Sequence, residues 1–117
     1  MKIKGIHVRV GEKPEIIEFK NSNQNFKLLV EGKAQLVILD NNTVMFCNEV
    51  GKLLGLEGNR ELDNGDVIAG NFIIVGDNGG EEPISLTDEQ VEKYMKRFDK
   101  IEYYVKIPLV DDMEECL

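Results

Sequence analysis

Apolar and polar residues alternate along residues 2–10, and this period of two predicts a half-buried strand. Residues 15–20 also have strand character, and the turn residues at 11–14 predict that the two strands form a hairpin. Two further apolar runs, at 34–39 and 44–47, are joined by Asp, Asn and Thr residues. Because Asn and Asp tolerate tight turns, these runs predict a second hairpin.

Two other segments follow the helical period. Residues 21–32 place apolar residues at helical spacing between a capping Ser or Asn and Gly32. Residues 87–98 show a stronger signal, because Thr87 and Gln90 have the spacing of a capping box. The apolar residues of this second helix recur at i, i+3, i+4 and i+7 and give it one apolar face for packing on a sheet. They are Val91, Tyr94, Met95 and Phe98.

The remaining segments complete the predicted fold. A turn at 63–66 precedes an apolar run at 67–75, which predicts a strand with a bulge or a close backbone approach at Gly70. Residues 76–83 predict an exposed loop, and residues 101–109 a last strand whose proline places it at a sheet edge. The order of elements predicts an α+β fold, a mostly antiparallel sheet with two helices packed on one face.

The composition is that of one ordinary globular domain. The chain has 117 residues, of which 42% are apolar and 31% charged, so it can bury a core without disulfides or metals. We expect a single α+β domain at residues 1–109 and an acidic C-terminal tail at 110–117. The charged, alternating start is unlike a signal peptide, and no window resembles a membrane span. We therefore expect a cytoplasmic protein that does not enter a membrane.

Acidic residues are concentrated towards the C-terminus. The net charge is −8, and residues 77–117 carry five Lys and Arg against twelve Asp and Glu. Such a surface repels phosphate backbones, which argues against direct nucleic-acid binding. It favours a partner protein with a basic surface, although acidity also serves solubility. The candidate partner-binding residues are Asp77, Glu81, Glu82, Asp111 and Asp112.

No set of residues matches a catalytic or metal-binding pattern. His7 is the single histidine, and the two cysteines have no CxxC spacing, which leaves too few ligands for a zinc site. We expect His7 to be a half-exposed strand residue and Cys47 to be a small buried one. The sequence therefore predicts a protein that is not an enzyme and needs no cofactor or metal.

The segment at 48–60 stands apart, because Gly, Asn and charged residues crowd between two apolar runs. Its Gly-Lys pair lacks the rest of a phosphate-binding P-loop, yet its glycine amides and two cations would suit a small anion-binding concavity. A plainer interpretation is that the glycines shape a connection and the cations lie in solvent. A third is a protein-binding surface that uses Leu53, Leu54 or Leu56. The candidate ligand-binding residues are Asn48, Gly51, Lys52, Asn59 and Arg60.

This part of the chain also resembles a known family. The matching pattern is an apolar strand followed by Asn48-Glu49, Gly51-Lys52, Gly55-Leu56, Asn59-Arg60, Leu62, Gly65-Asp66, Gly70, Phe72 and Ile74-Val75-Gly76, then a loop and the helix start SLTDEQ. Residues 2 to about 99 are similar in this way to a family of small domains of unknown function, found mainly in bacteriophages, plasmids and other mobile elements of Gram-positive bacteria.

That resemblance implies a biological setting and no mechanism. Small acidic proteins of mobile elements often act on host machinery, and many counteract host defence by binding. We therefore expect a non-enzymatic accessory protein that binds a host protein and inhibits it. The alternative is a small-ligand binder, for instance a sponge for a phosphorylated or nucleotide signal, that uses the segment at 48–60.

Overall fold

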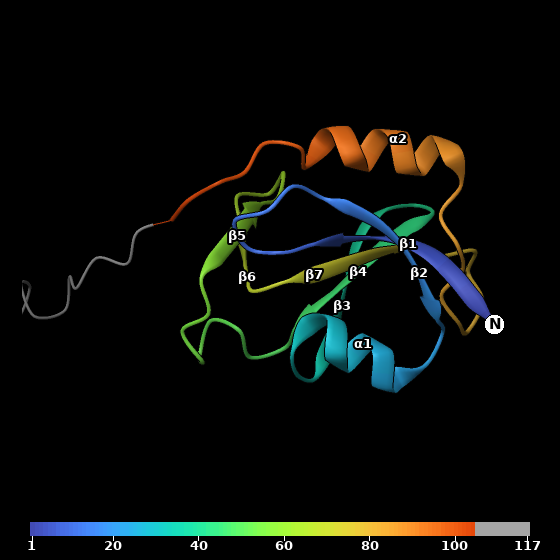
Figure 1. Cartoon of the computed structure of the whole chain (residues 1–117), viewed down its shortest axis with the longest axis horizontal. Helices are drawn as coiled ribbons and strands as arrows, with labels where there is room; N and C mark the ends of the chain where they lie inside the picture. Colours follow the sequence, from blue (N-terminus) through green and yellow to red (C-terminus); the bar gives the residue numbers. More distant parts are fainter. Residues whose placement is uncertain (105–117) are drawn as a thin grey trace, which may run out of the picture.

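The computed structural model describes residues 1–104. They form a five-stranded antiparallel sheet with a helix on each face and a small two-stranded sheet beside it (Figure 1). In chain order the elements are β1 (Lys2–Val8), β2 (Glu15–Lys20), α1 (Asn23–Val30), β3 (Ala34–Asp40), β4 (Thr43–Asn48), β5 (Gly58–Glu61), β6 (Val67–Ala69), β7 (Phe72–Gly76) and α2 (Asp88–Arg97). The large sheet has the order β2-β1-β7-β4-β3, and β5 pairs with β6. The predicted α+β class with a mostly antiparallel sheet is confirmed.

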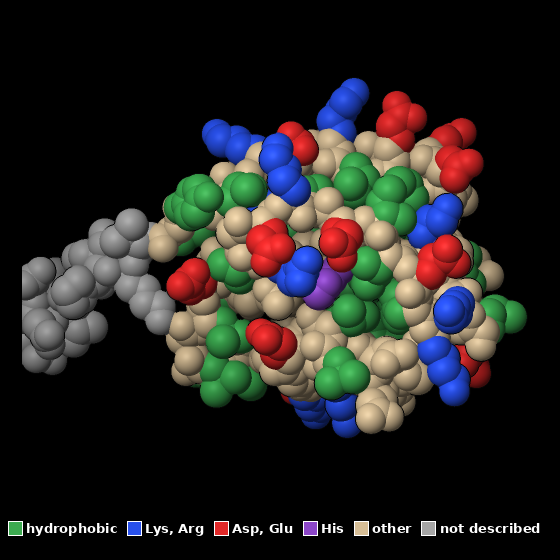
Figure 2. Space-filling model, viewed as in Figure 1, with side chains coloured by type: hydrophobic (Ala, Val, Ile, Leu, Met, Phe, Trp, Pro, Cys, Tyr) green, Lys and Arg blue, Asp and Glu red, His purple; other side chains and the backbone are tan. Residues whose placement is uncertain are grey.

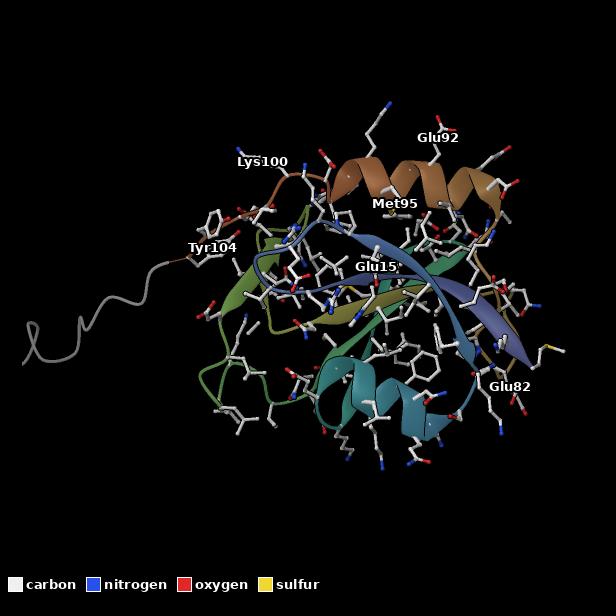
Figure 3. The ribbon with its side chains drawn as sticks, in the orientation of Figure 1. Glu15, Glu82, Glu92, Met95, Lys100 and Tyr104 are labelled. Atoms are coloured by element: carbon white, nitrogen blue, oxygen red, sulfur yellow. The ribbon has the colours of Figure 1, made fainter. Side chains whose placement is uncertain are left out.

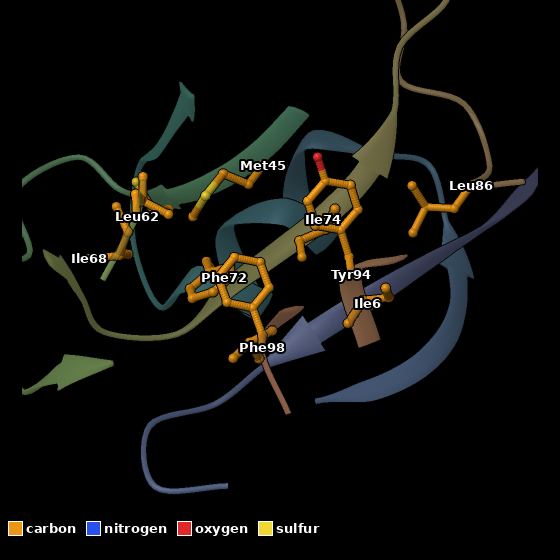
Figure 4. Packing of buried hydrophobic residues seen from close by; sticks show 11 residues of the cluster. Ile6, Met45, Leu62, Ile68, Phe72, Ile74, Leu86, Tyr94 and Phe98 are labelled. Atoms are coloured by element: carbon orange, nitrogen blue, oxygen red, sulfur yellow. The ribbon is translucent and has the colours of Figure 1, made fainter. Parts of the chain in front are cut away.

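The two helices lie on opposite faces of the large sheet, so the prediction that they share one face is wrong. The core under α1 contains Ile3, Phe26, Val30, Val44, Ile73 and Val75. The core under α2 includes Ile6, Val8, Met45, Phe72, Ile74, Tyr94 and Phe98 (Figure 4). Successive residues of β7 alternate between the two cores, because the side chains of a strand point to opposite faces. The whole of β7 is buried, as expected for a central strand that is covered on both sides.

Both helices begin where the capping patterns predict. The Ser22 side chain accepts a hydrogen bond from the Asn25 amide at the start of α1. At α2 the Gln90 amide donates to the Thr87 hydroxyl (3.2 Å), and the Thr87 amide donates to the Gln90 side chain (2.8 Å). This reciprocal pair confirms the predicted capping box. The helix ends at its C-cap Phe98, whose side chain is buried in the core.

The apolar run at 67–75 is divided at Gly70 and does not form one bulged strand. Gly70 has φ +88°, and the chain passes there from β6 in the small sheet to β7 in the large one. A Cβ at this glycine would lie 2.8 Å from Cδ1 of Leu56, so the predicted close approach is present. The two predicted hairpins, β1 with β2 and β3 with β4, are confirmed.

The last described residues, 101–104, contain no strand, in contrast to the prediction for 101–109. They lie against β5, where the Glu102 side chain accepts a hydrogen bond from the Glu61 amide at 3.0 Å. Residues 105–117, which include the rest of that predicted strand and the predicted acidic tail, lie outside the described residues. Within residues 1–104, no helix is both long enough and apolar enough to span a membrane.

Candidate functional site

The segment at 48–60 connects the large sheet to the small one (Figure 1). Its first residue ends β4, a compact turn follows, and its last residues open β5. The five predicted ligand-binding residues are distributed over these three parts, and the structure does not bring them into one cradle.

Asn48 is buried at the end of β4 and links this strand to the end of α1. Its Nδ2 donates to the carbonyls of Val30 (3.3 Å) and Glu31 (3.1 Å), and its Oδ1 accepts from the Val50 amide at 2.9 Å. Carbonyls at a helix C-terminus lack partners within the helix. The Asn48 side chain supplies such partners, and both of its polar atoms are occupied by the backbone.

The turn that follows is held by its own backbone hydrogen bonds. The Leu54 amide donates to the Val50 carbonyl (2.9 Å), and the Leu56 amide donates to the Gly51 carbonyl (3.0 Å). Gly51 is needed for a close approach, because a Cβ there would lie 2.7 Å from the carbonyl oxygen of Ala69 in β6. This glycine therefore serves packing between the turn and the small sheet.

A cavity of about 200 Å³ lies between this turn, β6, the outer strand β3 and its neighbour β4. Three of the predicted ligand-binding residues line it, namely Asn48, Gly51 and Lys52. Lys52 is already paired, since its Nζ lies 2.5 Å from Oδ1 of Asp66, and Glu49 also lines the cavity. Lys52 is neutralised by Asp66, and Glu49 pairs with Lys33 at 3.5 Å, so these charges give no net attraction for an anion. The ligand-binding hypothesis stays a prediction, and this geometry does not favour it.

Arg60 is completely buried, contrary to both sequence-based expectations for its charge. Its Nε donates to the carbonyl of Phe98 (3.1 Å), the C-cap of α2, and its Nη2 donates to the carbonyl of Glu12 (2.7 Å) in the turn between β1 and β2. Its Nη1 donates to the carbonyl (3.1 Å) and to Oδ1 (2.7 Å) of Asn59. All these acceptors are uncharged oxygens. Because they belong to three different segments, Arg60 connects β5 to the end of α2 and to the turn between β1 and β2.

Asn59 completes this buried polar pair. Its Nδ2 donates to the carbonyls of Val8 and Gly70, each at 2.9 Å, which joins the end of β1 to the break between β6 and β7. Burial lowers the pKa of the Arg60 guanidinium, but arginine stays protonated at any physiological pH. A buried charge needs its hydrogen bonds. Asn59 and Arg60 therefore fasten the small sheet to the large sheet and to α2, and neither lines the cavity beside Lys52.

Leu53 and Leu54 are the exposed apolar residues of the turn. Their exposed fractions are 88% and 63%, and Val50 beside them is exposed to 38%. Leu56 differs, because it is half-buried against Gly70. Of the three leucines named from the sequence as candidates for a protein-binding surface, two are available to a partner.

Three of the five predicted partner-binding residues lie at the other end of the molecule. Asp77, Glu81 and Glu82 belong to the loop after β7, and Figure 3 shows Glu82 at the end opposite to Tyr104. Both glutamates are exposed, whereas Asp77 is half-buried. On the face shown in Figure 2, acidic and basic side chains are interspersed with apolar ones. Asp111 and Asp112 lie outside the described residues.

Two titratable side chains attach the helices to the sheet. His7 is half-buried, as predicted, with Nε2 3.0 Å from the carbonyl of Leu29 in α1, and burial lowers its pKa. At Asp40 burial acts to raise the pKa, but hydrogen bonds from Tyr94 of α2 and from neighbouring groups lower it to about 2. Cys47 is buried, also as predicted. In the described part of the chain, no three His, Cys, Asp or Glu side chains are grouped to hold a metal ion.

Residues 1–99 match a family described as a domain of unknown function, DUF3846. The chain belongs to this family. The resemblance seen in the sequence, to a family of unknown function over residues 2 to about 99, is confirmed to that extent. No curated protein and no solved structure matches the chain.

The DUF3846 match covers the whole segment at 48–60 and the acidic loop at 77–83. It ends before Glu102 and Tyr104, which contact β5.

The sequence did not predict the structural role of Arg60 in this DUF3846 domain. No sequence pattern indicates this role, because the partners of Arg60 are main-chain carbonyls and one side-chain amide oxygen. Main-chain carbonyls occur at every residue.

Proposed function

We propose that this DUF3846 protein is a non-enzymatic accessory protein of a bacteriophage or other mobile element, and that it binds a host protein and inhibits it. The biological setting is supported by the family resemblance of the sequence. The binding mode is supported by one observation above others, the exposed pair Leu53 and Leu54 on an internally hydrogen-bonded turn.

Leu53 and Leu54 have the properties of interface anchors. Burial of a leucine side chain contributes about 1.5–3 kcal/mol, and binding energy at interfaces concentrates in a few buried side chains. Because backbone hydrogen bonds already order the turn, little further ordering is needed when a partner binds. The charged residues Glu49, Lys52 and Asp66 lie near these leucines and would form the polar rim of such an interface.

The acidic loop would act on the rate of binding. Charges at the rim of an interface mainly set the association rate and its dependence on salt. The exposed Glu81 and Glu82, with Asp77, would attract a partner that has a basic surface. Neutralising Asp77, Glu81, Glu82, Asp111 and Asp112 together should therefore slow association and flatten its salt dependence.

The test begins with affinity capture from host lysate, followed by binding and activity measurements on the captured protein. The double variant Leu53→Ser/Leu54→Ser should weaken binding by about 100-fold, because each lost leucine contact of about 1.5 kcal/mol changes Kd about tenfold. The native protein should inhibit the partner's activity, and the double variant should need a correspondingly higher concentration for the same inhibition.

The matched control is Leu28→Ser, since Leu28 has a similar exposed fraction of 68% but lies on α1. Binding by this control should equal binding by the native chain. Equal binding by the double variant would refute the role of the turn, and a captured partner whose activity is unaffected would refute inhibition.

A further inference from the structure

Strand β3 is an outer strand of the large sheet, and no described strand pairs with its outer side. The one charged residue of β3 is Asp40 at its end, and residues 34–39 contain neither a charged residue nor a proline. The other outer strand, β2, carries Glu15, Glu18 and Lys20. Charges on an edge strand oppose pairing with another chain. The sheet is therefore protected by charge at β2 and open along β3.

The backbone groups that point outwards from β3 follow from its pairing with β4. The Glu49 amide donates to the Lys33 carbonyl at 2.8 Å, which makes these two residues a hydrogen-bonded pair of the ladder. Hydrogen-bonded and non-hydrogen-bonded pairs alternate along antiparallel strands. Leu36, three residues after Lys33, and Ile38 are thus non-hydrogen-bonded with β4 and direct their N–H and C=O groups to the outer edge.

The side chains of the same two residues are exposed. Leu36 has an exposed fraction of 50% and Ile38 one of 73%. The register pairs Leu36 with Phe46 and Ile38 with Val44, and Val44 belongs to the core under α1. Leu36 and Ile38 therefore form an apolar strip on the α1 face, next to the unpaired edge.

We infer that a second copy of this chain pairs with β3 through antiparallel, twofold-symmetric strand addition. In the register centred on Val37, Leu36 lies opposite the partner's Ile38, and the two outward-facing residues can exchange hydrogen bonds. The apolar strip of each copy then covers that of the other on one face.

Charge at the two ends of β3 supports a second copy as the occupant. Lys33 precedes the strand and Asp40 ends it, with uncharged residues between them. Antiparallel pairing in this register brings Lys33 of one copy near the partner's Asp40, in addition to the ion pairs that Lys33 makes with Glu49 and Asp40 with Lys93 in each copy. A register shifted by two residues towards the C-terminus would place Asp40 opposite Leu36 and leave a carboxylate in an apolar pair, which is unfavourable. The strand is thus complementary to its own reverse.

The inferred dimer is weak, because one strand pair buries less than the approximately 800 Å² per partner of a typical stable interface. Sedimentation equilibrium from about 10 μM to 1 mM should show the mass rising from 13.3 kDa towards twice that value. The variant Ile38→Lys should raise the dimer Kd at least about tenfold. The control Ile16→Lys, on the exposed Ile16 of β2, should leave the Kd unchanged.

A cross-link tests the register. Val37 and the partner's Val37 form a non-hydrogen-bonded pair, whose Cα atoms lie about 4.5 Å apart, within reach of a disulfide. In a Cys116→Ser background, Val37→Cys should form a covalent dimer under mild oxidation, and Ile16→Cys should not. Circular dichroism checks that each variant is folded.

Three results would overturn the inference. They are a native chain that stays at 13.3 kDa throughout the concentration range, a dimer that is equally stable with Ile38→Lys, and a dimer that a folded Val37→Cys variant does not cross-link. If the native chain stays monomeric but binds a different protein along β3, the inference of a second copy is likewise overturned.

Discussion

Replacing Arg60 by alanine should destabilise the fold by about 3–5 kcal/mol. The side chain is fully buried and donates to oxygens of Asn59, Phe98 and Glu12. Its removal takes the donor from each of these acceptors, and a buried acceptor without a partner costs about 1–3 kcal/mol. Water that enters the vacated space restores part of this loss, so the total stays below the full sum. The expected loss of stability is still a large fraction of the roughly 5–15 kcal/mol by which a domain is typically stable.

Lys52 supplies the matched comparison, because it is the other cation of the same segment. Its ion pair with Asp66 is exposed, with side-chain exposed fractions of 66% and 49%. Exposed pairs of this kind contribute about 0–1 kcal/mol, so Lys52→Ala should lower stability by no more than that. Arg60→Lys keeps the charge but loses the planar fork that reaches three segments, and it should resemble Arg60→Ala more than the native chain.

The assay is urea denaturation at pH 7, followed by far-ultraviolet circular dichroism. A fall in the midpoint with an unchanged m-value reports a loss of stability rather than a change in the unfolded state. If the stability of Arg60→Ala lies within about 1 kcal/mol of that of the native chain, or if Arg60→Ala is no more destabilising than Lys52→Ala, the buried hydrogen bonds of Arg60 do not stabilise the fold.

Three further predictions concern the packing of the helices. Phe98→Ala should cost about 3–5 kcal/mol, because the ring is 1% exposed, and an unchanged urea midpoint would remove the end of α2 from the core. Burial lowers the pKa of His7 below its ordinary 6.5, so the unfolded state binds this proton more readily and stability should decrease as the pH falls below that value, then level off below the folded-state pKa. His7→Gln should abolish this part of the pH dependence, and equal slopes for both proteins between pH 7 and pH 5 would contradict it. Tyr94→Phe removes a hydrogen bond to Asp40, so the pKa of Asp40 should rise from about 2 towards 3.8 in a carboxyl NMR titration, and an unmoved pKa would contradict the role of this bond.

The elements that were predicted correctly depend on short-range interactions. The start of α2 follows from Thr87 and Gln90, which bond to each other three residues apart. The hairpin of β3 and β4 follows from two apolar runs and the polar turn between them. Such signals are visible in sequence because the interacting groups are neighbours in the chain. The membership in a family of unknown function was equally visible, since it depends on residue patterns alone.

The placement of the helices and of the polar residues at 48–60 was decided by the tertiary structure. Each helix has one apolar stripe, but the face that it covers depends on β7 lying at the centre of the sheet, with Ile73 on one side and Ile74 on the other. Arg60 looks like a solvent or ligand cation in the sequence, surrounded by polar neighbours. Its site exists only where Glu12 and Phe98, far apart in the chain, bring their carbonyls together. Because every residue has a carbonyl, only the folded backbone determines which ones meet at a buried charge.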